Sequence, residues 1–232
     1  MSVPRFFCDG ASLAAGETAF LAREEWRHVR ARRLSDGEAV VLLDGSGLEA
    51  EAVLTAGGTA ARVGLVRSGA AEPRLHVTVL LAAAEPSRVE WAVEKGTECG
   101  ALAFVLLAAE RSQEAHVRAL AAKDDRLVRI AREAVKQCGR SRVPSVYGPV
   151  ELADALAVVS RPILVASKGA PLAESAAPDV RSLSIAIGPE GGFSQPEDER
   201  FAEAGAQFVG LGPRTLRLET ALVALLSRLA IG

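Results

Sequence analysis

The first 70 residues alternate apolar and polar positions over short segments separated by turn signals. The alternation is clearest at residues 39–43, 50–54 and 61–66, and Asp-Gly, Gly-Ser-Gly and Gly-Gly sequences punctuate the stretch. A period of two is typical of strands with one buried face, and these glycine-containing sequences are typical of tight turns. The pattern predicts a small β barrel over residues 1–70.

After a linker-like stretch at residues 68–74, the pattern changes to apolar strands that alternate with longer helical segments. Strands are expected at about 75–83, 102–107, 162–167, 183–187 and 206–211, and helices at about 87–99, 119–138, 150–158, 196–204 and 218–230. Ser87 with Glu90 and Ser194 with Glu197 have the spacing of helix capping boxes. The alternation predicts an α/β domain over residues 74–232 with a mostly parallel sheet.

A glycine loop, Gly188-Pro-Glu-Gly-Gly-Phe-Ser194, lies between one of these strands and the next helix. We expect Gly188, Gly191 and Gly192 to adopt positive φ and to let the backbone approach a ligand closely. Glu190 in the loop disfavours a pyrophosphate, since like charges repel, and favours a neutral or cationic ligand. A second glycine loop, from residue 211 to 216, also joins a strand to a helix, so both loops can contribute to one ligand site.

Composition sets limits on compartment and partner. The formal net charge of −2 and the pI near 6.0 argue against a protein that coats nucleic acid nonspecifically, but leave room for a local basic surface. The 3 cysteines have neither disulfide-framework nor zinc-site spacing. There is no apolar run of about 18 residues and no secretory signal pattern, so we expect a cytoplasmic protein without membrane contact.

Gly45, Gly47 and Ala50 match the G-x-G-x-x-A fingerprint of Rossmann dinucleotide-binding folds after an apolar strand. A long helix would have to follow, but the pattern breaks at Gly57 and Gly58, and no acidic residue stands about 20 positions on. A hairpin turn is the favoured interpretation. If an oxidoreductase were correct, the isolated first domain would bind NAD.

Several further motifs occur in order along the chain: Arg5-Phe-Phe7, residues 28–37, Lys95-x-Thr-Glu-x-Gly100, Arg111-Ser112, Glu133-Ala-x-x-Gln-x-x-Arg140, Ile187-Gly-Pro-Glu-Gly-Gly-Phe-Ser194 and Leu216-Arg-x-Glu-Thr-Ala221. With them the whole chain resembles the RsmE-type small-subunit ribosomal RNA methyltransferases of the SPOUT superfamily. The resemblance implies a PUA-like RNA-binding β barrel, a C-terminal SPOUT domain with a deep trefoil knot, and a homodimer. It also implies methylation of N3 of one uridine in 16S ribosomal RNA, with S-adenosylmethionine as methyl donor and no metal. The chain departs from the family at Leu218, usually threonine, and at Arg32, more often apolar.

The resemblance places the cofactor in the two glycine loops, whose backbone would contact adenine and ribose while leucines pack on the ring. The expected cofactor residues are Gly188, Pro189, Glu190, Gly191, Gly192, Leu211, Gly212, Leu216 and Thr220. The expected RNA-binding residues are Arg5, Phe6, His28, Arg30, Arg33 and Arg111.

For catalysis, the hypothesis is that Arg217 or Arg140 stabilises charge developing on the uracil oxygens, while Glu219 orients that arginine or accepts the N3 proton. An ion pair at a helix start, or a solvated helix face in the case of Arg140, would explain the same residues without catalysis. Two other functions also stay open: a SPOUT enzyme that acts on another RNA or on a ribose 2′-hydroxyl, and a noncatalytic RNA-binding protein.

Overall fold

The computed structural model describes residues 3–10, 13–122, 124–172 and 180–229. The chain forms two compact units, the first made of Met1–Glu72 and Val135–Val143, the second of Pro73–Ala134 and Pro144–Gly232. The two-domain prediction had each domain as one continuous segment and placed residues 135–143 in the second. They belong to the first unit because Val135 packs with Phe7 and Leu43, and because residues 140–142 bond to Glu72.

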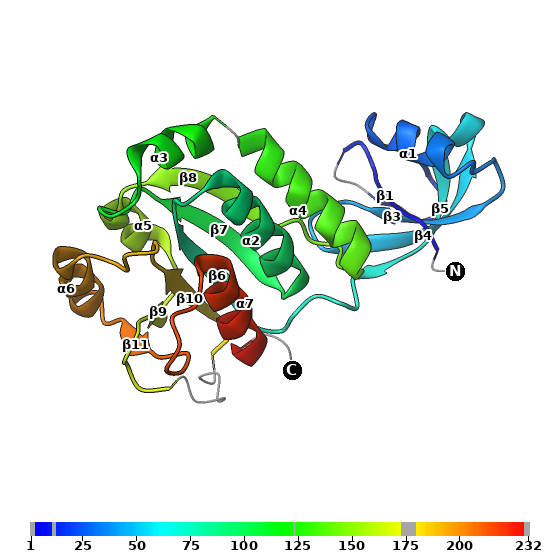
Figure 1. The fold of residues 1–232 in the computed structure, drawn as a ribbon. Coiled ribbons are helices and arrows are strands. Elements are labelled where there is room, and N and C mark those ends of the chain that lie inside the picture. Colours follow the sequence, from blue (N-terminus) through cyan, green and yellow to red (C-terminus); the bar gives the residue numbers. More distant parts are fainter. Residues whose placement is uncertain (1–2, 11–12, 123, 173–179, 230–232) are drawn as a thin grey trace. The chain divides into compact units, whose positions relative to one another are not determined.

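The first unit contains a five-stranded sheet in the order β1-β3-β4-β5-β2, visible in Figure 1. Its elements are β1 Arg5–Phe7, β2 Thr18–Phe20, α1 Glu25–Ala31, β3 Ala39–Leu43, β4 Leu48–Thr55, a short 3-10 helix Ala56–Gly58 and β5 Ala60–Ser68. The three predicted strands are confirmed as β3, β4 and β5. The prediction missed β1 and β2, because three residues are too few to show a period.

The sheet of the first unit curls until its two edges meet. At the ends of β1 and β2, the Asp9 N–H donates to Phe20 O at 2.8 Å, and the Ala22 N–H donates to Phe7 O at 2.8 Å. Curling brings the apolar faces of the strands around one core, which includes Phe6, Leu42 and Leu54. Joining the edges leaves fewer unpaired backbone groups than an open sheet would have.

The Gly45 motif is a hairpin turn. Asp44 Oδ1 accepts hydrogen bonds from the backbone N–H groups of Ser46 at 2.8 Å, Gly47 at 3.2 Å and Leu48 at 3.0 Å. This side chain therefore closes the turn between β3 and β4, which pair antiparallel. A Rossmann unit needs a parallel crossover through a helix, so the dinucleotide-binding alternative is wrong.

The second unit contains a six-stranded sheet in the order β11-β9-β10-β6-β7-β8, with every neighbouring pair parallel. The strands are β6 His76–Ala82, β7 Ala101–Leu107, β8 Ser145–Val150, β9 Ile163–Ala166, β10 Ser182–Ile187 and β11 Gln207–Val209. The helices are α2 Pro86–Glu98, α3 Glu114–Ala121, α4 Asp124–Cys138, α5 Leu152–Val158, α6 Gln195–Glu203 and α7 Leu218–Leu229, with the end of α4 in the first unit. The α/β prediction is confirmed.

Three details of the second-unit prediction are wrong. Strand β8 was missed, because Gly148 and Pro149 within it argue against a strand by propensity. The single helix expected over 119–138 is two helices, α3 and α4. The capping box at Ser87 does not form: α2 begins at Pro86, and the Ser87 hydroxyl donates to Glu85 Oε1 at 3.0 Å.

Helices α2 and α7 lie side by side over one face of the sheet (Figure 1). Gly96 of α2 permits this packing, since a Cβ there would lie 2.7 Å from Cζ of Phe104 in β7. The nearby Thr97 is buried and donates its hydroxyl to Val93 O at 2.7 Å. Of the other motif residues, Lys95 Nζ lies 2.8 Å from Glu98 Oε1 within α2, and Gly100 has a positive φ of 95° after the helix. In the described part of the chain, no helix is both long and apolar enough to cross a membrane.

Candidate functional site

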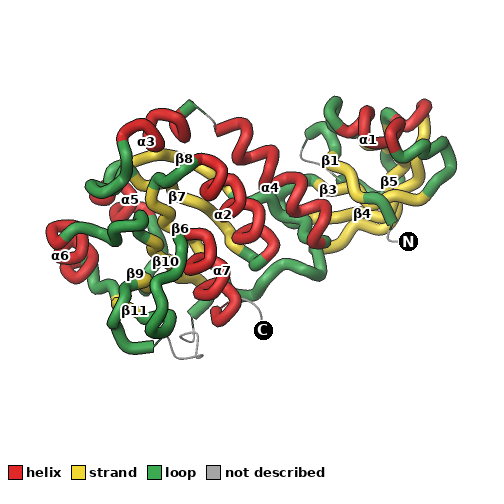
Figure 2. The backbone as a smooth tube through the Cα atoms, viewed as in Figure 1, coloured by secondary structure: helices red, strands yellow, loops and turns green. Residues whose placement is uncertain are grey.

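Three loops converge at one edge of the second-unit sheet. Strands β9, β10 and β11 are parallel neighbours, so their carboxyl ends lie at the same edge, where the loops that follow them gather (Figure 2). The loops enclose a cavity of about 260 Å³. Its lining residues are Ala166, Ser167, Lys168, Ile187, Gly188, Pro189, Glu190, Gly191, Gly192, Leu211, Gly212, Arg214, Thr215, Leu216, Leu218 and Ala221.

Eight of the nine residues expected to hold the cofactor line this cavity. The exception is Thr220, which is exposed and does not line it. In the first turn of α7 the lining positions are Leu218 and Ala221, three residues apart and therefore on one helix face. Leu218, where the chain departs from the family, is thus an apolar wall of the cavity.

The prediction missed the contribution of the β9 loop, which supplies Ser167 and Lys168. The Lys168 ammonium donates to the Thr215 hydroxyl at 2.9 Å and so links this loop to the one after β11. A signal was present in the sequence, because these polar residues directly follow a predicted apolar strand. Only the strand order shows that this loop lies between the two glycine loops.

The glycine loop after β10 is held at its carboxyl side by the predicted capping box. The Glu197 N–H donates to Ser194 Oγ at 3.3 Å, and the Ser194 N–H donates to Glu197 Oε2 at 2.8 Å. Of the three loop glycines, Gly192 has positive φ, at 70°. The expectation of positive φ was wrong for Gly188 and Gly191. At Gly188 the need is space, since a Cβ there would lie 3.1 Å from Phe193 N.

Arg111, in the segment that follows β7, stabilises the glycine loop that follows β10. Its Nη1 donates to Gly191 O at 2.7 Å and to Phe193 O at 3.0 Å. The preceding backbone N–H, of Glu110, donates to Glu197 Oε1 at 3.0 Å. Arg111 therefore positions the glycine loop through Nη1, and the RNA-binding role expected for this exposed residue stays a prediction.

Glu190 points a carboxylate into the same region but already has a cationic partner. Its Oε1 lies 3.2 Å from Arg88 Nη1 on α2, with both side chains partly exposed. Arg88 Nε also lies 3.3 Å from Glu85 Oε2, so Arg88 offsets only part of the negative charge of Glu190. The other charged lining residues are Lys168 and Arg214.

Glu219 and Arg217 flank the lining residue Leu218 at the start of α7. The Arg217 side chain is exposed. Glu219 Oε2 is buried, and among the described residues it has no hydrogen-bond partner. Burying an acceptor without a donor costs free energy, about 1–3 kcal/mol for a polar group and more for a charged one. Glu219 Oε2 is therefore a buried acceptor without a donor among the described residues, and the adjacent Leu218 lines the cavity.

Arg140 occupies a different environment, inside the first unit. The residue is 2% exposed, and its Nη2 lies 2.9 Å from Glu72 Oε2. Glu72 Oε1 also accepts the backbone N–H groups of Ser141 at 2.7 Å and Arg142 at 2.8 Å. The structure does not support the catalytic hypothesis for Arg140. Its guanidinium is buried and paired with Glu72, and this buried anchor holds residues 140–142 in place.

Ionisation of Glu72 follows from these contacts. Burial alone would raise the pKa of Glu72, but hydrogen bonds from the Arg140 guanidinium and from the amides of Arg142 and Ser141 outweigh it and hold the pKa below its usual 4.5. The pKa of Glu49, in the same unit, is also lowered: burial is overcome by hydrogen bonds from Arg5, Arg67 and Ser141. The two carboxylates therefore favour the charged state.

Two of the residues expected to bind RNA, Arg5 and Phe6, are engaged within the first unit. Arg5 Nη2 donates to Glu49 Oε2 at 2.8 Å and to Arg140 O at 3.0 Å, and Phe6 is 1% exposed in the core. The Phe6 ring is therefore a core residue, whereas the Arg5 side chain is 18% exposed and its guanidinium is paired with Glu49. The sequence could not separate a buried arginine from a phosphate-binding one, since the partner Glu49 is 44 positions away.

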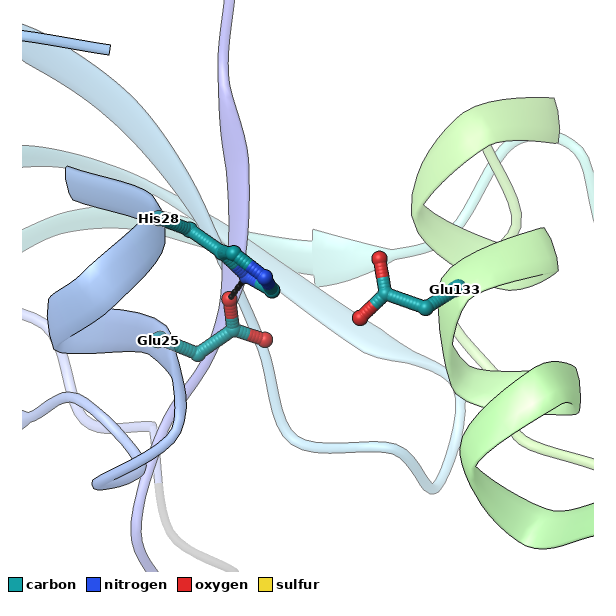
Figure 3. Close-up of side chains that lie close together, drawn as sticks. All are labelled: Glu25, His28 and Glu133. Carbon is teal, nitrogen blue, oxygen red and sulfur yellow. Dashed lines mark hydrogen bonds and ion pairs between the residues drawn. The ribbon is translucent and has the colours of Figure 1, made fainter. Parts of the chain in front are cut away.

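His28 is half-exposed, and its Nδ1 lies 2.9 Å from Oε2 of the buried Glu25, one turn earlier on α1 (Figure 3). Lys136 Nζ also contacts Glu25, at 2.9 Å from Oε1. The exposed edge of the imidazole is consistent with an RNA contact. The contact with Glu25 fixes the orientation of the ring.

A group of four arginines on α1 and the turn that follows it forms an exposed basic patch. The members are Arg27, Arg30, Arg32 and Arg33. No carboxylate within the described ranges lies at ion-pair distance from them. Because their guanidinium groups are unneutralised, this patch, hereafter the α1 patch, is the part of the first unit best suited to phosphates.

Comparison with known proteins agrees with this geometry. A family model described as an RNA methyltransferase domain matches residues 71–230. The ribosomal RNA small subunit methyltransferase E of Bacillus subtilis (strain 168) is 31% identical over 229 residues, which cover 92% of this chain and 90% of that protein. The protein of the same name from Mycobacterium bovis is 34% identical over an alignment of 238 residues. The alignment covers 93% of this chain and 87% of that protein.

The fold has a solved counterpart. A crystal structure of a ribosomal RNA small subunit methyltransferase E from Neisseria gonorrhoeae, bound to S-adenosyl methionine, superposes with a TM-score of 0.87 at 28% identity, covering 97% of this chain and 96% of that one. The chain therefore belongs to the RNA methyltransferase domain family and, within it, to the ribosomal RNA small subunit methyltransferases E.

Proposed function

We propose that this protein transfers a methyl group from S-adenosylmethionine to N3 of a uridine in the RNA of the small ribosomal subunit. The observation that carries the proposal is the cavity formed by three loops at the carboxyl ends of β9, β10 and β11, in a chain of this family. Family membership supports the cofactor and the RNA class. The atom that accepts the methyl group is our inference.

The residues of the cavity fit S-adenosylmethionine. Apolar walls from Ile187, Leu211 and Leu216 suit an adenine ring, and the glycines expose backbone amides and carbonyls for its polar edge. The bound cofactor would supply an electrophilic methyl group on a cationic sulfonium. Glu190, partly neutralised by Arg88, is compatible with that charge. The cavity volume of about 260 Å³ lies just below the ~300–1,000 Å³ typical of ligand sites.

Methyl transfer to uridine N3 also requires removal of the imide proton. Glu219 is the candidate acceptor, because Oε2 is buried and has no donor among the described residues. Arg217, two positions earlier and exposed, is the candidate for stabilising negative charge on the uracil oxygens. Holding nucleophile and methyl carbon in line would supply much of the remaining rate enhancement.

The first unit is proposed to bind the RNA as a PUA-like barrel, and the second unit to contain the trefoil knot of the SPOUT family. We also infer a homodimer. A base within a duplex is inaccessible, so the target uridine must be single-stranded or flipped out, and phosphate contacts must hold the flanking RNA. Arg30 and Arg33 of the α1 patch, with His28 beside them, are proposed for those contacts.

Replacing both Arg30 and Arg33 by alanine is expected to weaken RNA binding and to flatten its salt dependence. Each lost phosphate contact lowers the slope of log Kobs against log salt concentration by about 0.7–0.9, so the double variant should lose about 1.5. Fluorescence anisotropy with labelled small-subunit RNA over a salt series measures the slope. Arg23→Ala, an exposed arginine of the same unit, is the control, and an unchanged slope in the double variant would refute the phosphate role.

The methylated atom is determined by primer extension on ribosomal RNA from cells with and without this protein. A methyl group on N3 blocks Watson–Crick pairing and stops reverse transcription, whereas a 2′-O-methyl group leaves the pairing edge free. We expect one strong stop in small-subunit RNA that disappears when the gene is deleted and returns when the wild-type gene is supplied. Unchanged stops, together with loss of a ribose methylation, would replace the N3 assignment by the 2′-hydroxyl one.

A further inference from the structure

Lys168 is a cavity residue to which the sequence motifs assign no role. It lies in the loop after β9, the central strand of the three that form the site, and its side chain is exposed. Its ammonium donates to Thr215 Oγ1 at 2.9 Å. A lysine ammonium has three donors, so this contact leaves two for a ligand. Thr215 fixes the direction of the ammonium without neutralising its charge.

The charge balance of the lining favours a negatively charged ligand group near Lys168. Three lining residues are charged, namely Lys168, Arg214 and Glu190. Glu190 shares Arg88 with Glu85, whereas in the described part of the chain no carboxylate lies at ion-pair distance from Lys168 or Arg214. The cavity therefore has unneutralised positive charge on the side of the β9 and β11 loops.

We propose that Lys168 recognises the carboxylate of the methionine moiety of S-adenosylmethionine. The proposal rests on the proposed function, since it concerns the same cofactor. That carboxylate is the anionic group of the molecule, while the sulfonium and the amino group are cationic. A charge-assisted hydrogen bond to the carboxylate orients the amino-acid end toward the β9 and β11 loops and leaves the adenine to the apolar walls. By binding this carboxylate, Lys168 thus distinguishes S-adenosylmethionine from cationic nucleosides that lack it.

The experiment compares two cofactors that differ in this carboxylate. Isothermal titration calorimetry measures binding of S-adenosylmethionine and of decarboxylated S-adenosylmethionine to the wild-type protein and to Lys168→Met. Loss of one charge-assisted hydrogen bond at an exposed site should weaken S-adenosylmethionine binding about tenfold, which corresponds to about 1.4 kcal/mol. The decarboxylated compound should bind both proteins equally, and Lys168→Arg should restore most of the difference.

The matched control is Arg181→Met, which removes an exposed positive charge of the second unit outside the cavity lining and should change neither affinity. If Lys168→Met weakens both compounds equally, the lysine only ties the loops together and the proposal fails. If it changes neither compound but weakens RNA binding, Lys168 contacts a phosphate instead, and the proposal also fails. If the wild-type protein binds neither S-adenosylmethionine nor S-adenosylhomocysteine, the proposed function itself is wrong.

Discussion

Replacing Glu219 by glutamine is expected to lower kcat for RNA methylation by about 10²–10⁴-fold, the usual contribution of a positioned general base. The amide has nearly the same shape but cannot accept the N3 proton. Because Glu219 does not line the cavity, the Kd for S-adenosylmethionine should stay at its wild-type value. Single-turnover transfer of a labelled methyl group to small-subunit RNA, with calorimetry for the cofactor, measures both quantities.

The companion variant Arg217→Ala tests stabilisation of charge on the uracil oxygens, with an expected loss of about 10²-fold or more. Glu203→Gln and Arg200→Ala, two exposed residues of α6, are the matched controls and should keep full turnover. A proton-accepting role further requires that the pH dependence of kcat change in Glu219→Gln. Wild-type turnover in both test variants would show that Arg217 and Glu219 have no catalytic role and serve only to stabilise the start of α7.

Replacing Arg140 by alanine is expected to destabilise the protein by about 3–5 kcal/mol, the cost of leaving one charge of a buried pair without its partner. The Arg140 side chain is 3% exposed and that of Glu72 is 19% exposed, and Glu72 also holds the amides of residues 141 and 142. Denaturant unfolding followed by circular dichroism gives the free energy. The exposed Arg23→Ala should stay within about 0.5 kcal/mol of wild type.

The same pair predicts a dependence of stability on pH. Since the folded-state pKa of Glu72 is lowered from 4.5, its contribution is complete above pH 4.5 and is lost as the pH falls through the folded-state value. A double variant, Glu72→Gln with Arg140→Met, should therefore lose less stability on acidification than the wild-type protein does. At neutral pH, the double variant should also be less destabilised relative to wild type than Arg140→Ala is. Equal stability of Arg140→Ala and wild type would contradict the buried anchor.

The features that the sequence determined are those set by neighbours along the chain. The Ser194–Glu197 capping box, the turn at Asp44 and the period of the β3 to β5 strands each involve residues within about four positions of one another. Such short-range geometry is fixed by backbone and side-chain reach before any tertiary contact forms. The two glycine loops were placed correctly for the same reason, because each lies between a clear strand and a clear helix.

The roles of the arginines were decided only by the tertiary structure. Arg111 contacts Gly191, 80 positions away, and Arg140 contacts Glu72, 68 positions away. A guanidinium is equally suited to a phosphate, a carboxylate or a backbone carbonyl. The sequence showed that these arginines belong to motifs. The fold showed that Arg111 contacts a carbonyl of the glycine loop and that Arg140 contacts the carboxylate of Glu72.

The sequence by itself determined most of the strand-and-helix order of the second unit, except β8 and the break between α3 and α4, together with its glycine loops and the family resemblance. The tertiary structure decided that the β9 loop with Lys168 joins those loops, that residues 135–143 belong to the first unit, that Phe6 is buried and that Arg5 pairs with Glu49. The physical reason is that strand order in a parallel sheet is set by packing between segments far apart in the chain. The hydrophobic periodicity of one segment does not show which loops will meet at the edge of the sheet.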